Sequence, residues 1–152
     1  MLAFDVYRHW ETDLRPYVIN ALKRLTPEQL HTTPPGWDRN AWELAEHLVE
    51  AEWRWIYRNA LKQAPWTEAW QPGQFESLEQ LLAAWYRVHA VTLEWLHESP
   101  VSELSRVYPM PDVNYPSATM NWIVYHVIEH EAHHRGQIYM LLRLFGLNPP
   151  EA

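Results

Sequence analysis

The stretch "YHVIEHEAHHRGQIYMLLRLFG", residues 125–146, decides the fold class of this chain. Its apolar residues recur every three or four positions, which predicts a long helix with a single buried face. Two positions of that face, His130 and His134, hold histidine where leucine would be expected. Residues four apart on a helix lie about 40° apart around the axis and about 6 Å apart along it, so the two imidazoles point the same way.

Three more segments have amphipathic helical spacing, over residues 4–25, 41–63 and 78–98. Asn40 and Ser77 each precede a helix and are followed three residues later by Glu or Gln, a pairing typical of helix N-termini. The last helix is expected to start near residues 117–119 and to end before Gly146. Pro16 is expected to bend the first helix, and Thr26 to cap a short helical turn that follows it.

The four segments predict an all-α protein, a four-helix bundle that forms one domain over residues 1–152. The low glycine content, 4 residues, agrees with helices rather than with a turn-rich β fold. Residues 99–118 are expected to form a long proline-rich loop before the last helix, and residues 65–76 a connection between the second and third helices. Loops as long as the first of these are often functional.

Composition excludes several classes of partner. The formal net charge of −7 argues against DNA or RNA, because phosphate binding needs a basic face. Cysteine is absent, which excludes disulfides, thiolate metal sites and a cysteine nucleophile. The N-terminal stretch lacks the basic and apolar regions of a secretory signal, and no apolar run approaches membrane-spanning length. We therefore expect a cytoplasmic protein without a membrane partner.

The histidines on buried faces indicate a metal site. His47 lies on or beside the buried face of the second helix, as His130 and His134 do on the fourth. A single core imidazole can satisfy its donor and acceptor with ordinary partners, which is our interpretation of His89. Three imidazoles directed into one bundle are harder to satisfy unless a divalent metal takes a lone pair from each. An open fourth position would then hold water or a substrate atom.

The same stretch contains H-E-x-x-H, the zinc signature of many metalloproteases, at His130, Glu131 and His134. Such proteases need a third ligand downstream, and the remainder of the chain offers only Glu151 as a carboxylate. No strand-rich segment is predicted that could hold an extended peptide. We therefore interpret the match as coincidental and expect Glu131 to pair with Arg135 along the helix.

Residues around the histidine pair have several open roles. His126 and His133 could be substitute ligands, could support the ligands from behind, or could carry protons. Arg135 could steer an anionic cofactor, and Gln137 could hydrogen-bond a ligand or be an ordinary amide at the core edge. Gly136, inside a helix, suggests a close helix–helix contact. The sequence does not identify a catalytic residue.

Two longer stretches carry a resemblance to a known family. "WELAEHLVEAEWRW" and the closing "YHVIEHEAHHRGQIYMLLRLFG", with "PPGW" and "YPSATMNWIVYH" before the two helices, resemble the DinB/YfiT-like superfamily of metal-binding four-helix bundles. This family is unrelated to the DNA polymerase that shares the name. The resemblance implies an up-down-down-up bundle and one divalent metal, commonly zinc or nickel. Its ligand positions fall on His47, His130 and His134.

The resemblance also implies a choice of functions. Some members resemble transferases or isomerases that use low-molecular-weight thiols such as bacillithiol or mycothiol. Our leading hypothesis is a metal-dependent thiol S-transferase acting on a small electrophile, with an open metal position facing a pocket beside residues 99–118. The alternative is a non-catalytic metal-binding stress-response protein with a closed coordination sphere, completed by His126 or a carboxylate. A metal-dependent hydrolase is a third reading, and a homodimer is compatible with the surplus of aromatic residues.

Overall fold

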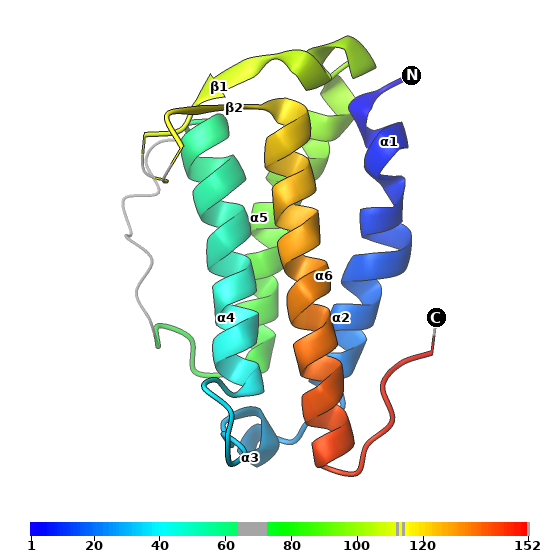
Figure 1. Ribbon diagram of the computed structural model, residues 1–152, viewed down its shortest axis with the longest axis vertical. Helices are drawn as coiled ribbons and strands as arrows, with labels where there is room; N and C mark the ends of the chain where they lie inside the picture. The colour runs from blue at the N-terminus through cyan, green and yellow to red at the C-terminus, as the bar shows by residue number, and fades with distance from the viewer. Residues whose placement is uncertain (64–72, 112, 114, 152) are drawn as a thin grey trace.

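The computed structural model of the protein describes residues 1–63, 73–111, 113 and 115–151. Within these residues four long helical segments pack side by side as a bundle (Figure 1). Each segment is called a limb below, because two of them combine α-helix with π-helix. The first and fourth limbs run one way and the second and third run the other, which is the predicted up-down-down-up order. The limbs are α1 (Ala3–His9) with α2 (Arg15–Lys23), then α4 (Ala41–Glu52), α5 (Leu78–Glu98) and α6 (Met120–Leu144), and the short α3 (Pro27–Leu30) precedes α4.

The predicted helix starts are confirmed by their caps. The side-chain oxygens of Thr26, Asn40, Ser77 and Thr119 each accept a hydrogen bond from the backbone N–H three residues further on. Each bond satisfies a backbone donor that the first turn of a helix leaves free. Gly146, with φ of 76°, follows α6, where a left-handed residue ends a helix at little cost. The predicted connection over residues 65–76 lies largely outside the described residues.

Two limbs contain wider π-helical turns that periodicity did not predict. In the first limb η1 (Trp10–Leu14) joins α1 to α2, and the N–H of Arg15 donates to the carbonyl of Trp10, five residues back. Pro16 follows at once and has no N–H to offer an ordinary α-helical bond. The first limb is therefore irregular directly before Pro16, where it forms a π turn. In the second limb α4 continues as η2 (Trp53–Ala60).

The described part of residues 99–118 has more regular structure than the predicted loop. They contain a 3₁₀ turn, η3 (Val101–Ser105), and a two-stranded antiparallel sheet of β1 (Val107–Pro109) and β2 (Ser117–Thr119). Tyr108 pairs with Ala118, and the following Met110 is fully buried. The segment covers the end of the bundle where α5 finishes and α6 begins (Figure 1).

The interior is filled mainly by apolar side chains. Trp10, Trp53 and Trp85 are among its largest members, each with at most 2% of its surface exposed. The helices are long because each presents one apolar face to this core. In the described part of the chain, none of them is long and apolar enough to cross a membrane.

Among the described residues, the close helix contact expected at Gly136 is absent. A Cβ atom added there would meet nothing within 4 Å, and the residue is exposed. Glycine in a helix interior costs about 1 kcal/mol relative to alanine. We therefore expect Gly136→Ala to raise the free energy of unfolding of the apoprotein by about that amount, as measured by urea denaturation. A loss of stability would mean that the position needs the freedom of glycine.

Candidate metal centre

Three histidines meet between α4 and α6. His47 lies in the middle of α4, and His130 and His134 lie one turn apart on α6. The Nε2 atom of His130 is 2.9 Å from Nε2 of His47 and 3.0 Å from Nε2 of His134. One nitrogen from each of the three rings lies within 4.8 Å of the others, so the cluster can hold a metal ion.

Burial keeps two of the three histidines, His130 and His134, in the neutral form that metal binding requires. Burial, reinforced by the neighbouring imidazoles, lowers the pKa of His130 to about 3. Burial also lowers the pKa of His134, against the opposing effect of its bond to Gln137. At neutral pH both rings therefore offer a lone pair on one nitrogen.

The three rings cannot meet all of their hydrogen-bonding requirements through one another alone. A neutral imidazole has one N–H, so Nε2 of His130 cannot complete proper hydrogen bonds to both neighbours. Its other nitrogen, Nδ1, is buried and has no hydrogen-bond partner within the described residues. A cation at the centre would take a lone pair from each Nε2 and remove the conflict.

The spacing also suits such a cation. Metal–nitrogen bonds of about 2.1 Å at tetrahedral angles place two ligand nitrogens about 3.4 Å apart. The observed separations of 2.9 and 3.0 Å are slightly shorter, and a small outward rotation of the rings makes room. Neutral imidazole donors suit zinc, nickel and copper better than calcium or magnesium.

The rear nitrogens of two of the rings face acceptors. Nδ1 of His134 lies 2.5 Å from Oε1 of Gln137 and donates to it. Nδ1 of His47 lies 3.8 Å from Oε2 of Glu50, an electrostatic contact, and Glu50 also pairs with Arg54. The contact with His47, together with Arg54, lowers the pKa of Glu50 against the effect of burial, so this carboxylate is ionised. Such acceptors hold a ligand's ring in place and leave Nε2 free for the metal.

Removal of one rear acceptor should weaken metal binding. Gln137→Leu keeps the size of the side chain but removes the acceptor for His134. We expect the dissociation constant for zinc or nickel to rise about tenfold, measured by competition with a chromogenic chelator. Glu129→Gln, an exposed change on the same helix, is the control and should leave the affinity within about twofold. Equal affinities for both variants would exclude an orienting role for Gln137.

A cavity of about 520 Å³ opens onto the histidines. It includes His47 and His134 in its lining, together with Gln137 and the segment that leads into α4. The site was predicted to open into a pocket beside residues 99–118. This cavity lies instead beside residues 36–39, and residues 99–118 lie at the other end of the bundle, so the prediction is wrong for this cavity (Figure 1). The full lining is Gly36, Trp37, Asp38, Arg39, Leu44, His47, His134 and Gln137.

A much smaller cavity, of about 80 Å³, lies on the side of the cluster towards residues 99–118. His47 and His130 line it, as do His126 and Trp55. The ring of His126 stacks on Trp122 at 4.8 Å between centroids, and it lies 6.4 Å from the ring of His130. His126 therefore belongs to an aromatic cluster beside the metal site.

The other residues singled out from the sequence lie at differing distances from the site. Gln137 contacts a candidate ligand directly, as described above. His133 is exposed, with its ring centroid 5.0 Å from that of His134. Arg135 lies over the ring of Tyr139, 5.9 Å from its centroid, and does not line the large cavity. The cation at the cavity is instead Arg39, which also contributes to the lowered pKa of His134.

Sequence reasoning missed Glu50 and the residues 36–39. Glu50 lies three positions after His47, a spacing that places two side chains on one helix face and could have suggested the contact. Residues 36–39 stand outside any periodic pattern, and only the packing of the chain before α4 brings Trp37 and Arg39 to the site.

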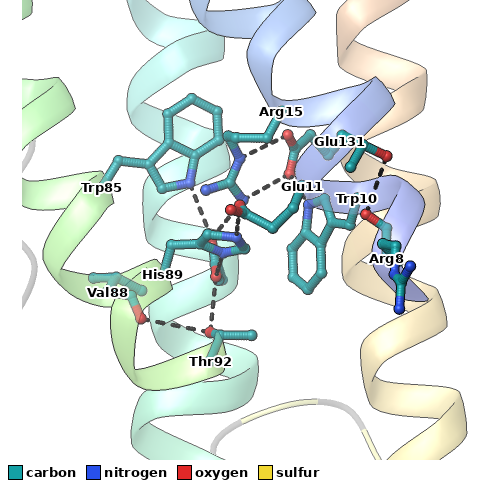
Figure 2. Close-up of polar contacts among 11 residues, drawn as sticks. Arg8, Trp10, Glu11, Arg15, Trp85, Val88, His89, Thr92 and Glu131 are labelled. Carbon is teal, nitrogen blue, oxygen red and sulfur yellow. Dashed lines mark hydrogen bonds and ion pairs between the residues drawn. The ribbon is translucent and has the colours of Figure 1, made fainter. Parts of the chain in front are cut away.

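A second polar cluster lies in the core, built from all four limbs (Figure 2). Its centre is the buried guanidinium of Arg15, whose Nε and Nη2 donate to the two oxygens of Glu131 at 2.8 and 2.9 Å. Nη2 also donates to Oε2 of Glu52 at 2.8 Å. His89 of α5 lies between two carboxylates, with Nδ1 2.6 Å from Glu52 and Nε2 2.7 Å from Glu11.

These contacts correct the expected role of Glu131. It is 1% exposed and binds Arg15 and the indole N–H of Trp10, instead of pairing with Arg135. One residue turns a helix by 100°, so the carboxylate points away from His130 and into the core. Glu131 is thus not placed to act on a substrate at the histidines, which agrees with the interpretation of H-E-x-x-H as coincidental. The reading of His89 as a hydrogen-bonded core residue is confirmed.

His89 carries a positive charge in this arrangement. An ionised carboxylate only accepts, so each ring nitrogen must bear a proton to bond both Glu52 and Glu11. Burial by itself lowers the pKa of His89, but the attraction of Glu52 and the bond to Glu11 outweigh it and raise the pKa. The cluster therefore holds two cations and three carboxylates.

The raised pKa of His89 predicts a loss of stability in alkali. A group with a raised folded-state pKa contributes stability that is complete below its unfolded pKa, near 6.5, and that disappears as pH rises through the folded value. The free energy of unfolding of the apoprotein should therefore fall as pH rises above about 6.5 and through the raised folded-state pKa of His89. In His89→Gln, which still donates one hydrogen bond, this slope should largely disappear. An equal slope in both proteins would assign the effect to other groups.

The fold and the histidine cluster together define a helical-bundle protein with a candidate metal centre. The sequence model of the DinB superfamily matches residues 12–138, and the chain belongs to that superfamily. A crystal structure of a DinB-like protein from Bacillus cereus ATCC 10987 has the same fold, with a TM-score of 0.73 and 21% sequence identity. The match covers 96% of this chain and 94% of that one. A comparison with curated proteins gave no match.

Proposed function

We propose that this protein binds one divalent transition metal, zinc or nickel, through His47, His130 and His134, and that it is a metal-dependent thiol S-transferase. The observation that carries the proposal is the convergence of three imidazoles between α4 and α6, two of which, those of His47 and His134, line a 520 Å³ cavity. A structural site would be closed by a fourth protein ligand. Within the described residues the candidate metal-binding group comprises these three histidines alone, which supports an open site.

The surroundings of His126 also favour an open site. Its ring is stacked on Trp122 and lies 6.4 Å from the ring of His130, centroid to centroid. Oε2 of Glu50 lies 3.8 Å from the rear nitrogen of His47, and Glu50 is not part of the candidate metal-binding group. These contacts of His126 and Glu50 support an open site.

A divalent ion held by neutral ligands keeps its full charge and lowers the pKa of a thiol or water molecule that reaches it. The chain has no cysteine, so the thiol would be an added small molecule. In the reaction the thiol sulfur bonds to the electrophilic carbon, the leaving group departs with the bonding electrons, and the thiol proton passes to solvent through the cavity. The residues of the chain hold the reactants close together.

The cavity lining indicates what could bind there. Arg39 places a positive charge at the cavity, and Trp37 offers an aromatic surface. A thiol that carries a carboxylate would be attracted by Arg39, although Asp38 beside it reduces the effect. Leu44 adds an apolar surface for the electrophile. The pocket thus suits a small, partly apolar substrate with one anionic group.

The test uses protein loaded with cobalt(II), whose visible spectrum reports its coordination. Addition of anionic and neutral low-molecular-weight thiols should change the spectrum, with tighter binding of the anionic ones. The zinc- and nickel-loaded forms should then conjugate a thiol to a chromogenic aryl halide or an epoxide faster than the thiol alone. Arg39→Ala should raise KM for the anionic thiol by several-fold, while Glu94→Gln, an exposed change on α5, should leave KM unchanged.

The results of this test distinguish a transferase from a hydrolase and from a structural metal site. A spectrum that no thiol alters, with conjugation at the uncatalysed rate, would sink the transferase proposal. Hydrolysis of activated esters by such a protein would indicate activation of water. Tight metal binding with no reaction at all, and greatly reduced stability without metal, would indicate a metal that joins α4 to α6 structurally.

A further inference from the structure

We propose that Arg15 is a positioning residue for the three-histidine site, because it holds α4 and α6 in the arrangement that brings the imidazoles together. The inference rests on the metal binding proposed above. His47 comes from α4, and His130 and His134 come from α6. The same two helices supply Glu52 and Glu131, the carboxylates that Arg15 binds; Figure 2 shows Arg15 against Glu131.

The contacts of Arg15 restrict the rotation of α6. Nε and Nη2 bond both oxygens of Glu131, a two-point contact that fixes the plane of the carboxylate. Glu131 is the residue next to His130 on the helix. A rotation of α6 by about 20° would move a ring nitrogen of His130 by about 2 Å, given the radius at which it stands from the axis. Metal bonds tolerate about a tenth of that displacement.

The same guanidinium also restrains α4. Nη2 of Arg15 donates to Oε2 of Glu131 and to Oε2 of Glu52, so a single nitrogen joins the two helices. The remaining lone pairs of Glu52 are occupied by donors from α5, namely the indole N–H of Trp85 at 3.0 Å, the hydroxyl of Thr92 at 2.8 Å and a ring nitrogen of His89 at 2.6 Å. Glu52 therefore has few other orientations available.

Water has little access to loosen this arrangement. Arg15 is 4% exposed, and its guanidinium lies 4.1 Å from the ring of Trp85 and 5.4 Å from that of Trp10. Buried ion pairs often add little net stability compared with apolar side chains of the same size. Their geometry is specific, however, and a planar fork that bonds two carboxylates cannot be replaced by the single point charge of lysine. A positional role accounts for a cluster that stability alone does not require.

The test compares the loss of metal affinity with the loss of stability. The variants are Arg15→Lys, which keeps the charge but not the fork, and the neutral triple variant Arg15→Met, Glu52→Gln and Glu131→Gln. Leu22→Ala is the matched control, because Leu22 is fully buried on the same helix as Arg15 and contributes to the apolar core. Each protein is studied without metal by urea unfolding, and its zinc affinity is measured by chelator competition under conditions where it is folded.

We expect Leu22→Ala to lose stability but to bind zinc within about twofold of the wild type. Arg15→Lys and the triple variant should bind zinc at least about tenfold more weakly, however stable each proves to be. Nitrogen-15 NMR of the metal-free histidines should show broadened or averaged ring signals for His130 and His134 in these variants and unchanged ones in Leu22→Ala. If Arg15→Lys does not fold, the zinc affinity and ring signals of the triple variant decide whether the buried ion pairs position the histidines.

Two results would overturn the inference in distinguishable ways. Wild-type affinity and wild-type ring signals in a folded Arg15 variant would remove the positioning role and leave the metal site intact. A wild-type protein that binds neither zinc nor nickel would instead overturn the proposed function, and the role of Arg15 with it.

Discussion

His47→Ala is expected to reduce the metal content of the purified protein from about one ion per chain to nearly none. The site has only three protein ligands in the proposed arrangement, and two imidazoles on one helix hold a divalent ion far more weakly than three. His47 is half-buried at the cavity, so its truncation should leave the bundle folded. Metal content is measured by mass spectrometry on protein purified without a histidine tag.

The neighbouring histidines provide matched controls for this experiment. His133→Ala removes an exposed imidazole next to His134 and should leave about one ion per chain. His126→Ala removes a histidine that is not a proposed ligand and whose ring lies 6.4 Å from that of His130, and it should also retain the metal. Loss of metal in His126→Ala would indicate a fourth ligand and a closed site. Retention of metal in His47→Ala would overturn the three-histidine assignment.

The sequence was sufficient to predict the helices and to select the three histidines. The evidence was local, because helix caps and apolar stripes depend on residues a few positions apart. His130 and His134 are four apart on one helix, and their common direction follows from that spacing alone. The place of His47 opposite them needed only the expectation that buried faces of neighbouring helices meet.

The charged core was not predicted, because its members are far apart in sequence. Arg15, Glu52 and Glu131 look like surface residues in isolation, and their pairing depends on how three helices pack. One signal was available: Glu52 continues the buried stripe of Leu44 and Leu48 at the same spacing of four, where a carboxylate requires a partner. The cavity is likewise set by the non-periodic segment before α4, which no local pattern places.

Glu52→Gln is expected to lower the free energy of unfolding of the apoprotein by about 3–5 kcal/mol, as for a broken buried ion pair. Glu52 is fully buried, and its oxygens accept from four side chains: Arg15, Trp85, His89 and Thr92. A glutamine has one oxygen and one amide group with two N–H donors. Its amide N–H groups would face the donors that now bond one carboxylate oxygen, and the positive charges of Arg15 and His89 would lose one negative partner. Glu94→Gln, on the exposed face of α5, should change stability by less than about 0.5 kcal/mol.

The dependence on pH distinguishes this loss from a simple packing defect. Burial by itself would raise the pKa of Glu52, but Arg15 and His89 outweigh it and hold the pKa well below its usual range. A depressed pKa contributes stability that is complete above the unfolded value, near 4.5, and that is lost as pH falls towards the folded one. Urea denaturation should therefore give wild-type and Glu52→Gln stabilities that differ most near neutral pH and converge in acid. A difference that stays constant down to about pH 3 would mean that the charge of Glu52 contributes nothing, and that shape alone accounts for the loss.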